Sequence, residues 1–360
     1  MEIILVYGTR PEIIKLSPLI RLISASEHTL KTIHTGQHYS HNLSELFINE
    51  FELPLPDWNL RVGSCSHAEQ TSKIIMGVGH VLENNNPDLV LVHGDTNTSL
   101  GAALSAAKMN ISLGHVEAGL RSFNKTMPEE INRKVVDQLS DINFCPTKVA
   151  YQNLRNEGIK NSINLITGNT IKDAINWMKS NVVWDGDILN NLGLIKESYA
   201  LVTIHRAKIT NDILLFEEVI NGITRFANSS NIEFVYPIHP RAKQRLNDHN
   251  FDMPNQIKLV DPQSYSDFLQ LQQNAAIVFT DSGGVQEEAC ILGTPCVTLR
   301  NDTERPETLA IGCNVLAGYD RYDIAEKGLI QLGRSLSKES VYGQGDSSRL
   351  IFNAILDEYN

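Results

Sequence analysis

Carboxylate side chains follow two neighbouring apolar segments of this sequence. Asp95 lies just beyond an apolar run over 89–92. Glu117 directly follows a second run, over 111–116. A helix-length stretch separates the runs, so the pattern predicts a βαβ unit with both acids at the carboxyl ends of parallel strands, where open α/β sheets bind ligands. Glu129 lies in the first turn of the next predicted helix, and acids grouped in this way indicate proton transfer.

Basic residues begin the first predicted helix of the chain. A strand over 3–6 leads through Gly8 to Arg10 and Pro11, and Lys15 lies about one turn into the helix. Pro11 fits the first helical position, where its missing N–H has no partner to lose. Because a helix N-terminus carries partial positive charge, these residues favour an anion site over a surface turn with solvated charges.

A glycine pair begins a helix in the second half of the chain. Ser282, Gly283 and Gly284 follow an apolar strand over 276–280. Glycine lets the backbone approach a ligand closely, and the exposed N–H groups suit a diphosphate, while Glu288 could accept hydrogen bonds from ribose hydroxyls. The other interpretation is a sharp turn with no ligand. The GxGxxG spacing of a dinucleotide site is absent, so the motif does not predict NAD.

Three further basic segments follow predicted strands in this half. They are His205-Arg206 after 201–204, His239 after 232–236 and Arg305 after 296–299. The chain carries a formal net charge of −11, so cations concentrated at strand ends indicate a local anionic ligand. The same charge balance argues against general affinity for nucleic acid or for an acidic membrane.

The elements that would position these residues alternate between strand and helix. Two such series predict an α/β fold with two Rossmann-like doubly wound domains facing each other across a cleft. Composition places the linker near 169–172. We therefore expect a first domain over 1–169, a second over 170–345, and a last helix over about 346–360 that packs back on the first.

Composition and cysteine usage bound the remaining possibilities. At 360 residues with 42% hydrophobic and 20% charged residues, the chain is typical of a soluble two-domain protein. Its apolar runs fall far short of the roughly 20 residues of a membrane helix, and its start lacks a basic signal region, so we expect a cytoplasmic protein. Its 5 cysteines show no CxxC pair and predict neither a disulfide framework nor a metal site.

Taken together, these motifs resemble the non-hydrolysing UDP-N-acetylglucosamine 2-epimerases. The matching segments are GTRPEIIK (8–15), TGQH (35–38), HGDTNTSL (93–100), GHVEAGLRS (114–122), MPEEINR (127–133), TGNT (167–170), IHR (204–206), TDSGGVQEEA (280–289) and TERPE (303–307). They keep the order of the family from the N-terminus to about residue 350. The resemblance implies a GT-B-type fold, a homodimer, and interconversion of UDP-GlcNAc and UDP-ManNAc without a cofactor.

The resemblance also implies a route. Carbon 2 of this sugar is not next to a carbonyl, so enolisation cannot invert it; UDP is instead eliminated to give 2-acetamidoglucal and is then added back. Motif matching places Asp95, Glu117 and Glu129 in the acid/base group of the first domain, with His205 as a further catalytic residue beside the phosphates. The residues expected to bind UDP, from the resemblance and the strand ends, are Arg10, Lys15, His205, Arg206, His239, Ser282, Gly283, Gly284, Glu288 and Arg305.

Two positions depart from the family pattern. The family usually has Glu two residues after its His-Arg pair, where this chain has Lys208, and the charge reversal bears on substrate affinity or domain closure. Relatives regulated by UDP-GlcNAc carry a second Gln shortly after the glutamine of TxQH, where this chain has Ser40. The sequence alone therefore leaves allosteric activation by the substrate open.

Two other functions stay open. Epimerases of UDP-2,3-diacetamido-glucuronate tend to carry Arg-Pro-Gln near the start, whereas Glu12 and the Arg305-Pro306 run favour the GlcNAc-type substrate. A non-catalytic UDP-sugar sensor is the alternative that Lys208 supports. A GT-B glycosyltransferase would share the fold but would not need three acids at the rim of the first domain.

Overall fold

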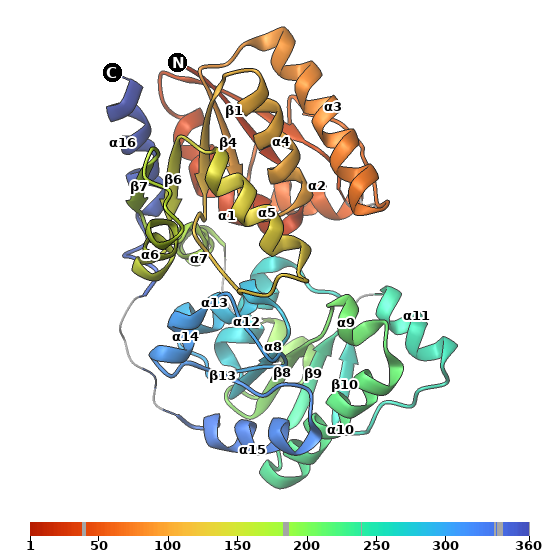
Figure 1. The fold of residues 1–360 in the computed structure, drawn as a ribbon. Coiled ribbons are helices and arrows are strands. Elements are labelled where there is room, and N and C mark those ends of the chain that lie inside the picture. The colour runs from red at the N-terminus through yellow and green to blue at the C-terminus, as the bar shows by residue number, and fades with distance from the viewer. Residues whose placement is uncertain (38–40, 183–186, 239, 335, 337–340, 360) are drawn as a thin grey trace. The chain divides into compact units, whose positions relative to one another are not determined.

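The computed structural model describes residues 1–37, 41–182, 187–238, 240–334, 336 and 341–359, and the chain divides into two units. The first comprises Met1–Met178 and Val341–Asn360, and the second comprises Lys179–Ser340. Each contains one parallel sheet with helices packed against it (Figure 1). The predicted α/β class, with two Rossmann-like sheets, is confirmed.

The first sheet has the strand order β3-β2-β1-β4-β5-β6-β7. Its central strands are fully buried apolar runs, as expected for a parallel sheet covered on both faces. The order reverses between β1 and β4, and at such a switch point the connecting loops diverge and leave room for a ligand. The strands are β1 Glu2–Tyr7, β2 Thr29–His34, β3 Trp58–Asn59, β4 Leu89–His93, β5 Ser112–Val116, β6 Ile142–Cys145 and β7 Ile163–Ile166.

Helices cover both faces of this sheet. They are α1 Arg10–Ser24, α2 His41–Glu50, α3 His67–Asn85, α4 Asn97–Lys108, α5 Pro128–Leu139, α6 Lys148–Asn156, α7 Thr170–Asn181 and α16 Ser347–Tyr359. Alternate side chains of β1 point to opposite faces. Ile3 and Leu5 share a core with α1 and α16, whereas Ile4 and Val6 share another with α3 and α4.

The second sheet has the order β10-β9-β8-β11-β12-β13, so its switch point lies between β8 and β11. Its strands are β8 Tyr199–Thr203, β9 Glu233–Pro237, β10 Ile257–Val260, β11 Ile277–Thr280, β12 Cys296–Thr298 and β13 Asn314–Leu316. Its helices are α8 Asp187–Leu192, α9 Ala207–Thr210, α10 Ile213–Ser230, α11 Pro240–Asp248, α12 Tyr265–Asn274, α13 Gly283–Leu292, α14 Pro306–Ala310 and α15 Arg321–Gln331.

The division between the units falls inside α7, after Met178, and not near residues 169–172. Trp177 of this helix stacks on Phe51 at a ring-centroid distance of 5.7 Å and lies 4.0 Å beneath the guanidinium of Arg21. Asp173 accepts hydrogen bonds from the first N–H groups of α16, which also belongs to the first unit. These contacts attach α7 to the first unit, and the change in composition at residue 169 marks only the start of the helix.

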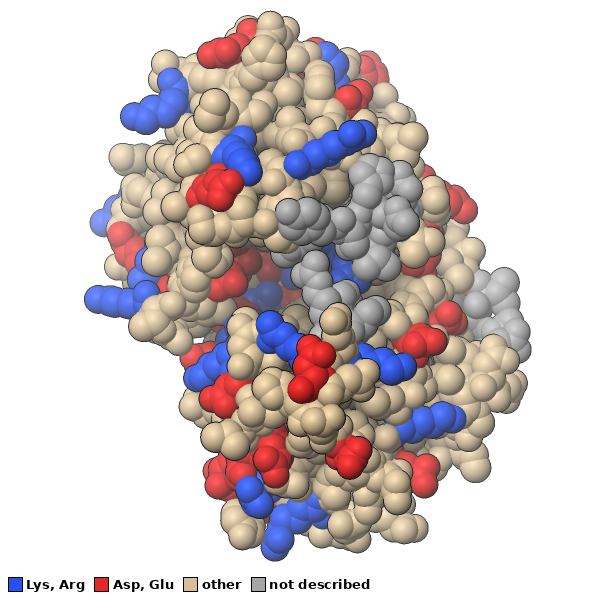
Figure 2. Space-filling model, turned by 90° about the vertical axis from the view of Figure 1, so that its right-hand side faces the viewer, with Lys and Arg blue, Asp and Glu red and all other residues tan. Residues whose placement is uncertain are grey.

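The surface carries both signs of charge. Figure 2 shows Lys and Arg side chains interspersed with Asp and Glu over the face in view. The described Lys and Arg residues in that view form no extended basic patch of the kind that binds nucleic acid. Among the described residues, no helix combines the length and the apolar character that crossing a membrane requires.

Candidate functional site

The turn after β1 supplies its own anion. Thr9 caps α1, and Glu12 Oε2 accepts hydrogen bonds from the N–H groups of Gly8 at 3.0 Å and Thr9 at 2.7 Å. Burial raises the pKa of Glu12, although hydrogen bonds from Thr9 and Thr96 oppose the shift. This carboxylate therefore engages the two N–H groups of the turn that directly precedes α1.

Glu117, at the end of β5, lies in a buried ion pair with Lys15 of α1. His93 Nε2 lies 3.3 Å from the same carboxylate oxygen, Oε2, and all three side chains are less than a tenth exposed. Glu117 also has a φ of 70°, a left-handed conformation that is costly for a residue with a Cβ atom. Strained backbone of this kind is retained at functional sites where the surrounding structure fixes it.

Asp95, at the end of β4, forms an ion pair with Arg133 of α5. Arg133 is buried and also contacts Glu130 at 3.2 Å, while Asn132 donates a hydrogen bond to the backbone oxygen of Asp95 at 2.9 Å. Glu129 is partly exposed, and no described residue donates a hydrogen bond to it. Two of the three predicted acids, Asp95 and Glu117, thus form ion pairs with basic side chains. The third, Glu129, is in contact with solvent at the start of α5.

His205, at the end of β8, is oriented by a buried aspartate. Its Nδ1 lies 2.9 Å from Asp281 Oδ1, and the same carboxylate accepts the N–H groups of His205 at 3.0 Å and Arg206 at 2.8 Å. Burial alone would raise the pKa of Asp281, but His205 and these N–H groups outweigh it and lower the pKa. The ring is 58% exposed, so Nε2 remains available to a ligand while Nδ1–H is committed to Asp281.

The predicted glycine pair begins α13, directly after β11. Ser282 is the N-cap and accepts the N–H of Val285 at 3.5 Å. A Cβ atom on Gly283 would lie 2.5 Å from Glu304 Oε1, whereas one on Gly284 would meet nothing closer than 3.9 Å. Gly283 is therefore required by packing within the unit, and Gly284 is not.

Behind the glycines, the carboxylate of Glu304 lies among three arginines. It accepts a hydrogen bond from Arg300 at 2.8 Å and lies 3.6 Å from Arg206 and 3.7 Å from Arg305. Burial would raise the pKa of Glu304, but these positive charges hold it well below its usual value. Arg305 is itself buried and paired with Glu287, so in this structure its guanidinium contacts other protein groups.

The remaining predicted residues fall in three places. Glu288 is buried and accepts hydrogen bonds from Tyr265 Oη at 3.0 Å and Gln272 Nε2 at 2.8 Å. Arg10 is partly buried, which lowers its pKa, and its guanidinium lies 5.8 Å from the ring centroid of Phe47. His239 and Ser40 lie outside the described residues.

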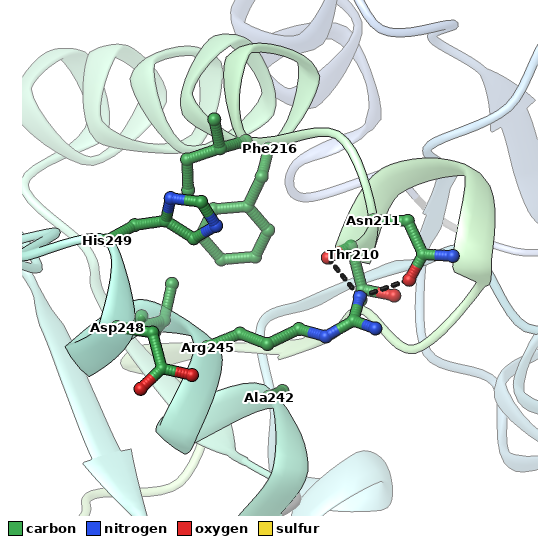
Figure 3. Close-up of a pocket in the computed structure, with 9 residues that line it drawn as sticks. Thr210, Asn211, Phe216, Ala242, Arg245, Asp248 and His249 are labelled. Atoms are coloured by element: carbon green, nitrogen blue, oxygen red, sulfur yellow. Dashed lines mark hydrogen bonds between the residues drawn. The ribbon is translucent and has the colours of Figure 1, made fainter.

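A surface pocket of about 340 Å³ lies elsewhere in the second unit, between α10 and α11 (Figure 3). Phe216 and Leu246 contribute apolar lining, and Arg245 donates hydrogen bonds to the backbone oxygen of Thr210 and to Asn211. None of the predicted site residues lines it. Within the described part of the chain, no cluster of His, Cys, Asp or Glu could hold a metal ion.

Pattern reasoning missed the partners of the predicted residues. Asp281 orients His205, His93 contacts Glu117, and Arg133 contacts Asp95. The two residues of each pair come from different parts of the sequence. Asp281 had a usable signal, since it follows β11, the neighbour of β8 in the sheet. The other two required the fold, because they depend on how β4, β5 and α5 are placed.

Known proteins resemble this chain in both sequence and fold. The family model for UDP-N-acetylglucosamine 2-epimerase matches residues 21–356. The chain is 42% identical to the UDP-N-acetylglucosamine 2-epimerase of Methanococcus maripaludis, over 98% of each chain, and 36% identical to the UDP-2,3-diacetamido-2,3-dideoxy-D-glucuronate 2-epimerase of Pseudomonas aeruginosa, also over 98% of each. It superposes with a TM-score of 0.93 and 40% identity on the crystal structure of Methanocaldococcus jannaschii UDP-GlcNAc 2-epimerase in complex with UDP-GlcNAc and UDP, covering 99% of this chain and all of that one.

Proposed function

Because the chain belongs to the UDP-N-acetylglucosamine 2-epimerase family, we propose that it interconverts UDP-GlcNAc and UDP-ManNAc by eliminating UDP and adding it back. The observation that carries the proposal is the similarity over almost the whole chain to an epimerase crystallised with UDP-GlcNAc and UDP. The arrangement of acids at one switch point and cations at the other supports it chemically.

The acid/base chemistry is proposed for Asp95, Glu117 and Glu129 of the first unit. Elimination removes the proton at carbon 2, and re-addition returns a proton to the other face, so groups that can take and give a proton are needed near that carbon. The ion pair with Lys15 favours the ionised, base-competent form of Glu117. Glu129 contacts solvent and can exchange a proton with it.

The leaving diphosphate is assigned to the second unit. With Nδ1–H committed to Asp281, His205 directs Nε2 toward a phosphate oxygen and, in its imidazolium form, can donate a hydrogen bond there as negative charge develops. Ser282 and Gly284 open α13, whose N-terminus favours an anion, and Arg206 adds positive charge. The proposed UDP-binding residues are Arg206, His205, Ser282, Gly283, Gly284 and Glu288. Arg10 and His239 are proposed as further contacts. Lys15 and Arg305 are proposed to contribute indirectly, through the carboxylates with which they pair, Glu117 and Glu287.

The substrate is tested by offering two sugar nucleotides to the purified protein. We expect proton NMR to show UDP-ManNAc forming from UDP-GlcNAc, with a kcat/KM at least tenfold higher than for UDP-2,3-diacetamido-glucuronate. The latter is the second candidate because a relative at 36% identity is named for it. Turnover of the glucuronate alone would select that candidate, and binding of UDP-GlcNAc without turnover would select a sensor.

Three finer expectations stay predictions. Sedimentation of the purified protein tests the homodimer that the sequence resemblance implies. Fractionation of cells tests the cytoplasmic location. UDP-ManNAc saturation curves with and without added UDP-GlcNAc test activation by the substrate; a hyperbolic curve that added UDP-GlcNAc leaves unchanged argues against it.

A further inference from the structure

A buried histidine connects the two turns that carry Asp95 and Glu117. His115 lies on β5, and its Nδ1 is 2.7 Å from Asp137 Oδ1 while its Nε2 is 2.8 Å from the backbone oxygen of Gly94. Neither His115 nor Asp137 has any solvent exposure. The ring therefore bridges α5 to the turn that follows β4.

Both partners of this ring are hydrogen-bond acceptors. A carboxylate and a carbonyl oxygen can each be satisfied only by an N–H, and a neutral imidazole has one N–H. The two contacts together require both nitrogens of His115 to carry hydrogen, which makes the ring an imidazolium. A buried cation of this kind persists only if it is paired and hydrogen-bonded, and Asp137 provides the pairing.

The surrounding charges balance that assignment. Arg121 contacts Asp137 Oδ2 at 2.7 Å and Glu157 at 2.6 Å, so two cations face two carboxylates in the cluster. Burial alone would raise the pKa of Asp137, but His115 and Arg121 outweigh it and lower the pKa. The carboxylate of Asp137 is therefore charged and can hold both of its cations.

The cluster acts on the backbone of both turns. On one side His115 holds the carbonyl of Gly94, which has a φ of 68° and whose N–H bonds to Val116 O at 2.9 Å. On the other side Asp137 accepts the N–H of Gly119 at 3.2 Å, two residues after the strained Glu117. The same pair of side chains thus fixes the turn before Asp95 and the turn after Glu117.

We propose that His115, as an imidazolium paired with Asp137, is a positioning residue for epimerisation, holding the Asp95 and Glu117 turns at the relative placement that proton transfer requires. The inference rests on the proposed function, because it needs those two acids to be the acid/base group. His115 does not touch the substrate, since it is enclosed by the protein. A purely structural cluster would change stability and leave the turnover of folded protein as it was.

The first test compares three variants of the full-length protein. His115→Gln and Asp137→Asn each remove one charge of the pair, and Ile355→Ala creates a cavity beneath α16 that lowers stability without removing any group of the His115 and Asp137 cluster. We expect kcat of the first two to fall about a hundredfold per folded molecule, with KM for UDP-GlcNAc changed less than about threefold, because the displaced groups act in chemistry. Ile355→Ala should keep the wild-type kcat.

Two results would overturn the proposal. One is a His115→Gln or Asp137→Asn protein whose kcat, corrected for its folded fraction, falls no further than that of Ile355→Ala. The other comes from nitrogen-15 NMR of histidine-labelled wild-type protein, in which the proposal requires a bound hydrogen on both ring nitrogens of His115; a bare nitrogen contradicts it even if both variants fail to fold. A wild-type protein without epimerase activity would instead refute the proposed function, and the NMR result would still decide the charge state.

Discussion

Asp281 determines how His205 can act in the proposed reaction. Its carboxylate accepts the ring Nδ1–H and two backbone N–H groups, so Nδ1 carries hydrogen and the ring has one direction. This arrangement fixes the ring before a ligand arrives. In its imidazolium form, a histidine held in this way can offer Nε2–H to a phosphate without reorganisation during the reaction.

The pKa of Asp281 predicts a pH dependence of stability. A carboxylate whose pKa is lowered in the folded protein stabilises the fold above its unfolded-state pKa of about 4, and this contribution disappears as the pH falls toward the folded-state pKa. The wild type should lose stability as the pH falls below about 4, and Asp281→Asn should lose less over the same range while being less stable at neutral pH. Urea unfolding measures this, with exposed Asp252→Asn as the control; identical pH slopes for all three proteins would count against the pairing.

Single residues also show what the sequence could predict. The positions of Asp95 and Glu117 were predictable, because each follows an apolar strand of a βαβ unit and therefore lies at the carboxyl end of that strand. The pairing of Glu117 with Lys15, 102 residues earlier, was not, because it depends on β1 and β5 flanking β4. The role of Glu12 in the turn before α1 was not predictable either, since only the structure shows its carboxylate folded back onto the N–H groups of Gly8 and Thr9.

At the scale of elements, α13 offers a matched pair of glycines. Gly283→Ala places a methyl group against buried Glu304 and should destabilise the second unit by about 1–3 kcal/mol. Gly284→Ala has room for the methyl group and should change stability by less than about 1 kcal/mol, in the stabilising direction. Thermal unfolding distinguishes them, and equal losses of stability would contradict the packing argument.

Gly284→Ala also tests the anion site. If a diphosphate approaches the backbone at the start of α13, the new methyl group obstructs it, and KM for UDP-GlcNAc should rise about tenfold in a protein of normal stability. An unchanged KM would remove Gly284 from the proposed site.

The short helix α9 explains how Lys208 is accommodated. The Nζ atom of Lys208 lies 4.6 Å from the ring centroid of Tyr319, a cation–π contact that joins α9 to the loop before α15. Lys208→Glu loses this contact and places a negative charge close to His205 and Arg206. We expect KM or kcat for UDP-GlcNAc to change several-fold, with Tyr319→Phe as the control that keeps the ring; wild-type kinetics in Lys208→Glu would show that the charge reversal has no consequence.

At the scale of the whole molecule, two sheets repeat one design. Both reverse strand order beside their first strand, β1 or β8, and in both the predicted residues follow strands at or next to that reversal. Asp95 and Glu117 follow β4 and β5, and His205 and Ser282 follow β8 and β11. Alternation of strands and helices was sufficient to predict this plan. The boundary was misplaced because Trp177 packs on Arg21 and Phe51, contacts that composition does not encode.

Incubation with UDP-GlcNAc in deuterium oxide, followed by NMR of the recovered sugars, tests the proposed elimination and re-addition of UDP. Reversible loss of the hydrogen at carbon 2 predicts deuterium at that position in both UDP-GlcNAc and UDP-ManNAc. Glu117→Gln should incorporate it about 10²–10⁴-fold more slowly, while exposed Glu83→Gln should match the wild type. Formation of UDP-ManNAc that retains its original hydrogen at carbon 2 would rule out the proposed removal of that proton.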